Sequence, residues 1–298
     1  MLLVSTFRAP PASPAPSSKP SPRSVQGQGA GRVLAVTSGK GGVGKTFVSA
    51  NLAAALARRG LRVLVLDADL GLANLDVVLN LYARITLHDV LTGKAKLEQA
   101  IVPAPGGFSV LMGGSGMAEY ARLTPDMRDK FTQVLNTLTP RYDVVLLDTG
   151  AGISDAVLFA ISLASEVLLV ATPEPTSLTD AYATIKVLVN QQRRPRIHMI
   201  VNQASRPGDG RAITMQLQQV VERFVVPEGA EGAEGASHAG EAGRLIHLGD
   251  IPSDPAVRQA VMRRQLLMQA MPGAPAALAM VQVASKLQDT ALRPGTGD

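Results

Sequence analysis

The chain has 298 residues, a formal net charge of +5 and no cysteine, and 46% of its residues are hydrophobic. This length suits one large α/β domain. The absence of cysteine excludes disulfides, thiolate catalysis, zinc ribbons and iron–sulfur ligation, and it favours a cytoplasmic protein.

Residues 1–31 are rich in proline and serine and contain little that could be buried, so we predict a disordered tail. Its apolar start, Met1–Thr6, is too short for a signal peptide or a membrane span. The tail carries three of the five net positive charges, through Arg8, Lys19 and Arg23. Because the rest of the chain is nearly neutral, direct binding of nucleic acid is not expected.

From residue 32 onward, apolar runs of strand length alternate with segments of helical spacing. The expected strands are Val33–Val36, Val63–Leu66, Phe108–Met112, Val144–Leu147, Val167–Val170, Ile197–Val201 and Leu245–Leu248. The expected helices are Thr46–Arg59, Met127–Leu138, Asp155–Leu163, Leu178–Asn190 and Ile213–Phe224. Most of the strand runs lack polar alternation, which is typical of strands buried on both faces. The pattern predicts an α/β fold with a doubly wound, mostly parallel β-sheet flanked by helices.

The first predicted strand runs into Ser38–Thr46, which matches the phosphate-binding pattern G-x-x-x-x-G-K-[ST]. Glycines allow backbone N–H groups to curl round phosphates, and the helix N-terminus adds positive potential. We expect Lys45 to neutralise the β- and γ-phosphate oxygens of ATP, and the Thr46 hydroxyl to ligate Mg²⁺. The predicted nucleotide-binding residues of this loop are Gly39, Gly41, Gly42, Val43, Gly44, Lys45, Thr46 and Phe47.

Carboxylates follow two other predicted strands. Asp67 and Asp69 end the second strand, and Asp148 ends Val144–Leu147. Ligands of such sheets sit at the carboxyl ends of the strands, so these side chains are expected beside the phosphates. Carboxylates there would repel ATP unless a cation lay between, so they imply Mg²⁺. Asp148 is expected to hold Mg²⁺ through water, whereas Asp76 is better explained as a turn cap.

The additional lysine in this loop, Lys40 of K-G-G-V-G-K-T, resembles the deviant Walker A motif of the MinD/ParA family of P-loop ATPases. The resemblance implies that Lys40 reaches across an ATP-dependent homodimer to the partner's nucleotide, as an arginine finger does. It also implies that Asp69 orients the attacking water and that Asp67 lies near Thr46 and the Mg²⁺ shell. The expected activity is Mg-dependent ATP hydrolysis of low intrinsic turnover, with Lys40, Lys45 and Asp69 in catalytic roles.

Recognition of the base is expected late in the chain. Asn202 stands where family members use an amide to read adenine, since an amide can donate and accept at once. The segment Ile251–Val257, with Pro252 and Asp254, resembles the loop that walls the base. Turn chemistry alone is the open alternative for both assignments.

Within the family, the stretch Thr172–Ala183 resembles the flagellar number regulators FlhG/FleN more than division-site MinD. The resemblance covers about residues 32–288 and implies a switch that regulates flagellar number and placement. The partners that it implies are an FlhF-type GTPase, flagellar switch-complex proteins and a transcriptional activator. Residues 1–31 do not match the Asp-Gln-Ala…Leu-Arg helix with which many such regulators stimulate the GTPase, so that role is not predicted.

The remaining segments are predicted from composition. Residues 227–243 are expected to form a flexible low-complexity insertion in the ATPase domain 32–288, followed by a disordered tail at 289–298. Residues 274–298 have no net charge, and Ala276–Leu287 suits a packed helix better than an interfacial one. We therefore expect weak membrane binding at most, with transient membrane or cell-pole association as the alternative to a purely cytoplasmic location.

Other functions in the same family remain open. Nitrogenase-type iron proteins and cluster carriers need cysteines, and this chain has none. MinD-like division-site and ParA-like DNA-partitioning ATPases are the nearest alternatives. A non-hydrolysing, ATP-gated scaffold is an alternative of a different class, and measurement of turnover distinguishes it.

Overall fold

A computed structural model of the chain describes residues 31–69, 74–114, 124–225 and 243–290. Apart from their end residues, the predicted N-terminal tail and the predicted insertion at 227–243 lie outside the described residues. The predicted C-terminal tail at 289–298 lies outside them from residue 291. Residues 70–73, in the loop after Asp69, are also outside.

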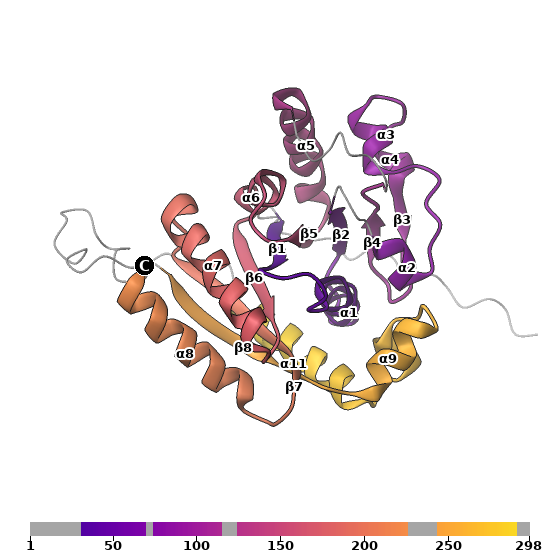
Figure 1. The fold of residues 1–298 in the computed structure, drawn as a ribbon. Helices are drawn as coiled ribbons and strands as arrows, with labels where there is room; N and C mark the ends of the chain where they lie inside the picture. Colours follow the sequence, from indigo (N-terminus) through magenta and orange to yellow (C-terminus); the bar gives the residue numbers. More distant parts are fainter. Residues whose placement is uncertain (1–30, 70–73, 115–123, 226–242, 291–298) are drawn as a thin grey trace, which may run out of the picture.

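In the described residues, eight strands form one sheet in the order β3-β4-β2-β5-β1-β6-β7-β8 (Figure 1). The strands are β1 (Arg32–Ser38), β2 (Val63–Ala68), β3 (Ile101–Pro103), β4 (Ser109–Leu111), β5 (Val144–Ala151), β6 (Glu166–Ala171), β7 (Arg196–Ala204) and β8 (Arg244–Pro252). Every pairing is parallel except that of β3 with β4. The carboxyl ends of the seven parallel strands therefore share one edge of the sheet, and β1 lies centrally between β5 and β6.

Helices cover both faces of the sheet, because buried side chains alternate between two apolar layers along the strands. One layer contains α3 (Leu87–Leu91), α4 (Leu97–Ala100), α5 (Pro125–Leu138), α6 (Asp155–Ser162), α7 (Pro175–Gln192) and α8 (Asp209–Phe224). The other contains α1 (Lys45–Arg58), α2 (Leu75–Leu79), α9 (Pro255–Met262), α10 (Leu267–Ala270) and α11 (Pro275–Thr290). In β1, Val33 and Ala35 face the first layer, and Leu34 and Val36 face the second. The predicted doubly wound, mostly parallel fold is confirmed.

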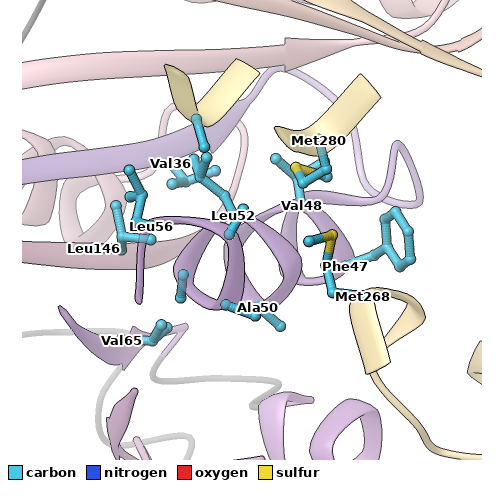
Figure 2. Close-up of a cluster of buried hydrophobic side chains, with 14 of the residues drawn as sticks. Val36, Phe47, Val48, Ala50, Leu52, Leu56, Val65, Leu146, Met268 and Met280 are labelled. Atoms are coloured by element: carbon cyan, nitrogen blue, oxygen red, sulfur yellow. The ribbon is translucent and has the colours of Figure 1, made fainter. Parts of the chain in front are cut away.

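Helix α1 is the most deeply buried helix of the second layer, and it positions the phosphate-binding loop at its N-terminus. Figure 2 shows Leu52 and Leu56 of this helix among side chains of the central strands, with Met268 and Met280 from the C-terminal helices close by. The helix ends where expected, because Gly60 adopts a φ of 87° and its N–H bonds to the Ala57 carbonyl.

Each predicted strand and helix corresponds to an observed element, with shifted ends. The sequence pattern missed α2, α3, α4, α9, α10 and β3. Most of these are four to eight residues long, which is too short for a helical period to stand out. Strand β3 is a three-residue edge strand that ends in Pro103, a residue that cannot donate a ladder hydrogen bond.

The predicted packed helix near the C-terminus is confirmed. Helix α11 lies against α1 and β8, and Met280, Val283 and Leu287 are almost fully buried. It extends to Thr290, so residues 289 and 290, which were expected in the disordered tail, are helical. In the described ranges, none of the helices has the length and apolar character needed to cross a bilayer.

Candidate functional site

The loop Gly39–Thr46 leaves the end of β1 and enters α1, as the phosphate-binding pattern requires. Gly42 and Gly44 adopt φ values of 80° and 93°, which disfavour residues with a Cβ. A Cβ at Gly44 would also come within 2.5 Å of the Asn202 side-chain nitrogen. Around Gly41 and Gly42 there is open space, so backbone N–H groups of the loop can approach a ligand closely.

A cavity of about 760 Å³ opens beside this loop. Its walls come from the loop, the end of β2, the start of α2 and the segment after β5, and they include Gly42, Lys45, Thr46, Phe47, Asp69, Asn74 and Gly150. The segment after β5 is tied to the phosphate-binding loop, because the Gly152 N–H donates to the Ser38 carbonyl at 2.8 Å. The volume lies in the range of small-ligand sites. Residues of the predicted phosphate-binding loop and Asp69 therefore meet around one cavity, whereas Asp67 and Asp148 are not among its lining residues.

Asp67 and Asp148 occupy directly paired positions on the neighbouring strands β2 and β5. Both side chains are almost fully buried. Burial and the Asp148 charge raise the pKa of Asp67 well above its usual value, and burial raises the pKa of Asp148 to about 6. Oδ2 of Asp67 has no hydrogen-bond partner among the described residues. A buried pair of carboxylates with an unpaired oxygen is the donor set that a hard cation such as Mg²⁺ prefers, so these residues fit the ion that the sequence implies.

Lys45 and Asp69 are the charged groups of the cavity wall. Burial lowers the pKa of Lys45, while Asp148 and Asp69 act in the opposite direction and favour its charged form. Oδ1 of Asp69 would lie 3.4 Å from a Cβ at Gly150, so Asp69 stands directly beside the end of β5. The backbone N–H of Asp69 donates to Asp67 Oδ1 at 3.1 Å, which ties the Asp67 carboxylate to the start of the loop after β2.

The Lys40 side chain, which was expected to reach a partner protomer, contacts residues of its own chain. Its Nζ lies 3.2 Å from Glu174 Oε2 and 3.0 Å from Thr176 Oγ1, at the N-terminus of α7. Both partners belong to the Thr172–Ala183 stretch that resembles the flagellar branch. The sequence offered no signal for this contact, since a separation of more than 130 residues carries no local pattern.

Two of the residues predicted to read the base, Asn202 and Asp254, already have hydrogen-bond partners within the protein. The Asn202 side chain is buried; its Nδ2 donates to the Val43 carbonyl at 2.8 Å, and its Oδ1 accepts from the Gln203 N–H at 3.0 Å. Asp254 is the N-cap of α9, and it also accepts from the Ala276 N–H at 3.1 Å. Pro252 is the last residue of β8, so the expected loop Ile251–Val257 is reduced to two residues between β8 and α9. The adenine-binding roles remain predictions.

Ser49 is a residue of the site that the sequence pattern did not identify. Its hydroxyl donates to Asp148 Oδ1 at 2.8 Å, inside the protein. The available signal was its position three residues after Thr46, which places both hydroxyls on one side of α1.

Comparisons with known proteins agree with this geometry. A family model described as "ParA: NUBPL iron-transfer P-loop NTPase" matches residues 29–288, which is most of the chain. The chain belongs to the ParA family of P-loop NTPases. This ParA-family member has no cysteine, so the iron transfer in that description has no thiolate ligand here.

Two curated relatives of this ParA-family chain are flagellar proteins. The antiactivator FleN of Pseudomonas aeruginosa PAO1 is 41% identical over 256 residues, which are 86% of each chain. The flagellum site-determining protein YlxH of Helicobacter pylori 26695 is 32% identical over 266 residues, which are 88% of this chain and 84% of the relative. The predicted resemblance to the flagellar branch is confirmed.

A solved structure of a similar protein contains a bound nucleotide. The septum site-determining protein MinD complexed with Mg-ADP, from Pyrococcus horikoshii OT3, is 30% identical and has a TM-score of 0.66. The match covers 87% of this ParA-family chain and 97% of that MinD chain. Binding of Mg²⁺ with an adenine nucleotide is thus a property of this family.

Proposed function

We propose that this ParA-family protein is an ATP-dependent, dimerising switch ATPase that regulates the number and placement of flagella. The observation that carries the proposal is the similarity to FleN over 86% of both chains, in a protein whose phosphate-binding loop, Lys45 and Asp69 line one cavity. The family consists of ATPases, so hydrolysis of ATP is its general activity.

Residues of the cavity wall and of the neighbouring strands β2 and β5 have separate roles in binding and in hydrolysis. The backbone of Gly39–Gly44 and the Lys45 ammonium hold the phosphates, and the start of α1 adds positive potential. Thr46, Asp67 and Asp148 would hold Mg²⁺, with Asp148 acting through water. When bound, this ion would neutralise charge on the β- and γ-phosphate oxygens. Asp69 faces the same cavity and orients the attacking water, which makes it the residue on which turnover depends.

The base is proposed to bind beside Asn202. This amide already holds the loop through Val43, and one of its N–H groups is left for adenine. Pro252 and Asp254 would form the wall of the base site, with the Asp254 carboxylate fixed by its bonds to two helix termini. Because Asn202 touches the loop directly, binding of the base and ordering of the phosphate-binding loop are coupled.

Lys40 is proposed to act on the nucleotide of a partner protomer. In the single chain it pairs with Glu174 at the protein surface, and its side chain is 39% exposed. Exposed ion pairs contribute little free energy, so this contact is given up at small cost when two protomers pair face to face. The ammonium then stabilises charge that develops on the transferred phosphoryl group of the partner's ATP.

Replacing Lys40 by alanine tests this step. We expect ATP hydrolysis to fall by about 10²–10³-fold, the effect of removing one donor aimed at transition-state charge, while ATP binding by the monomer is retained. Turnover is measured by phosphate release and binding by a fluorescent ATP analogue. The matched control is Lys130→Ala, which removes another exposed lysine paired with a carboxylate, that of Asp126. Equal turnover in Lys40→Ala and the wild type would remove Lys40 from the mechanism.

The cellular part of the proposal concerns partners and location. We propose a cytoplasmic protein of low intrinsic turnover whose ATP-bound homodimer presents a surface to flagellar partners. Candidates are an FlhF-type GTPase, switch-complex proteins and a transcriptional activator. Weak membrane attachment at most is proposed, because α11 is packed against α1 and β8 and the segment from residue 274 onward has no net charge.

A further inference from the structure

Ser49 lies on α1, one helical turn after Thr46, and is fully buried. Its hydroxyl donates to Asp148 Oδ1 at 2.8 Å, across a separation of 99 residues. The Thr46 hydroxyl lies close to the same carboxylate and acts to lower its pKa. Asp148 is therefore held by one hydroxyl of α1 and lies close to a second, and both hydroxyls project from the same side of this helix.

The direction of the Ser49 hydroxyl is unusual for this chain. Hydroxyls in its other helices commonly bond to the backbone carbonyl four residues earlier, as Thr132, Thr184 and Thr214 do. The Ser49 hydroxyl instead leaves α1 and reaches β5. Because Ser49 is fully buried, its hydroxyl has no water to bond to, and it bonds to one oxygen of a buried carboxylate.

The bond fixes the Asp148 carboxylate against a competing force. Asp67, directly opposite on β2, repels Asp148 when both are charged. A carboxylate that was free to turn could move away from Asp67 and from the loop. With Oδ1 held by Ser49, the Asp148 carboxylate stays directed from β5 toward α1, the helix that carries Thr46.

We propose that Ser49 is a positioning residue of the Mg²⁺ site, which orients Asp148 so that the carboxylate meets the hydrated ion beside Thr46. This inference rests on the proposed function, because it takes the cavity to be a Mg-nucleotide site. Replacing a residue whose hydrogen bond orients a metal-binding group typically lowers metal affinity by about 10–100-fold.

Binding of a fluorescent ADP analogue, titrated with Mg²⁺ and measured again in EDTA, tests the inference. For Ser49→Ala we expect the Mg²⁺ concentration at half-maximal effect to rise about tenfold. Binding of the analogue in EDTA should stay unchanged, since the loop and Lys45 are intact. A general structural defect would lower binding under both conditions and would contradict the inference. Ser49→Cys, which keeps the size and a weak donor, should lie between Ser49→Ala and the wild type.

The matched control is Ser165→Ala. Ser165 is an exposed serine whose hydroxyl donates to the Val33 carbonyl at 2.9 Å, at the end of the sheet opposite the cavity. It should behave as the wild type does. A double-mutant cycle with Asp148→Asn gives a second readout: if Ser49 acts through Asp148, Ser49→Ala should have little further effect in that background.

The outcomes separate the inference from the function on which it rests. If the wild type binds the analogue with no response to Mg²⁺, the proposed function fails. If the wild type responds to Mg²⁺ and Ser49→Ala responds at the same concentration, the function stands and the role of Ser49 is wrong.

Discussion

Replacing Asp69 by alanine is expected to lower ATP turnover by about 10²–10⁴-fold, the range typical for loss of a group that handles the proton of the reacting water. Asp69 lines the cavity beside Lys45 and Gly150, where it can reach a water next to the γ-phosphate. The substitution leaves the loop glycines and Lys45 in place. ATP-dependent dimerisation should therefore persist, and light scattering with ATP should show a stable dimer.

Asp76→Ala is the matched control for this prediction. Asp76 is an exposed acid in the first turn of α2, whose N-cap is Asn74, and its carboxylate accepts from the N–H of Val77 at 2.8 Å. Its removal should leave turnover near that of the wild type. If Asp69→Ala hydrolysed ATP at the wild-type rate, a residue other than Asp69 would have to orient the attacking water. If the wild type itself shows no turnover even with flagellar partners, the protein is a non-hydrolysing scaffold.

Replacing Gly39 by alanine is expected to destabilise the fold even without nucleotide. A Cβ at Gly39 would lie 2.2 Å from the carbonyl carbon and oxygen of Asp180 in α7, and this backbone cannot rotate away as a side chain can. Overpacking of this kind costs about 1–3 kcal/mol. Because α7 and the phosphate-binding loop would be pushed apart, we expect nucleotide affinity to fall with the stability.

Gly41→Ala provides the comparison within the same loop. A Cβ at Gly41 meets no other atom within 4 Å, so the free energy of unfolding should stay within about 0.5 kcal/mol of the wild type. Thermal or urea unfolding of the nucleotide-free proteins measures the difference. Equal stability of the two variants would show that α7 does not pack against Gly39 as described.

The sequence was sufficient for the features that follow a local pattern. Runs of Val, Ile and Leu without polar alternation identified the buried parallel strands, and the loop Gly39–Thr46 identified the phosphate site. Single-turn helices such as α2 and α4 were missed, because four or five residues do not complete a helical period that can be recognised.

Long-range contacts in the site could not be predicted from the sequence, for a different reason. The contacts of Lys40 with Glu174, Ser49 with Asp148 and Asn202 with Val43 join residues about 100 to 160 positions apart. They depend on which strands become neighbours, and β1 lies between β5 and β6 although β2 follows it in the chain. Asp254 combines both kinds of contact: its carboxylate caps α9 locally and also accepts from the Ala276 N–H at the start of α11, and its role beside the base stays a prediction.

Flagella per cell, counted by electron microscopy in the protein's own host, test the central claim most directly. The strains to compare are the wild type, a deletion of the gene and a chromosomal Asp69→Ala allele. We expect the deletion to give extra or misplaced flagella and the allele, locked in its ATP-bound form, to change flagellar number as well. Normal flagella in the deletion strain, together with minicells or anucleate cells, would contradict the claim and assign the ATPase to division or partitioning.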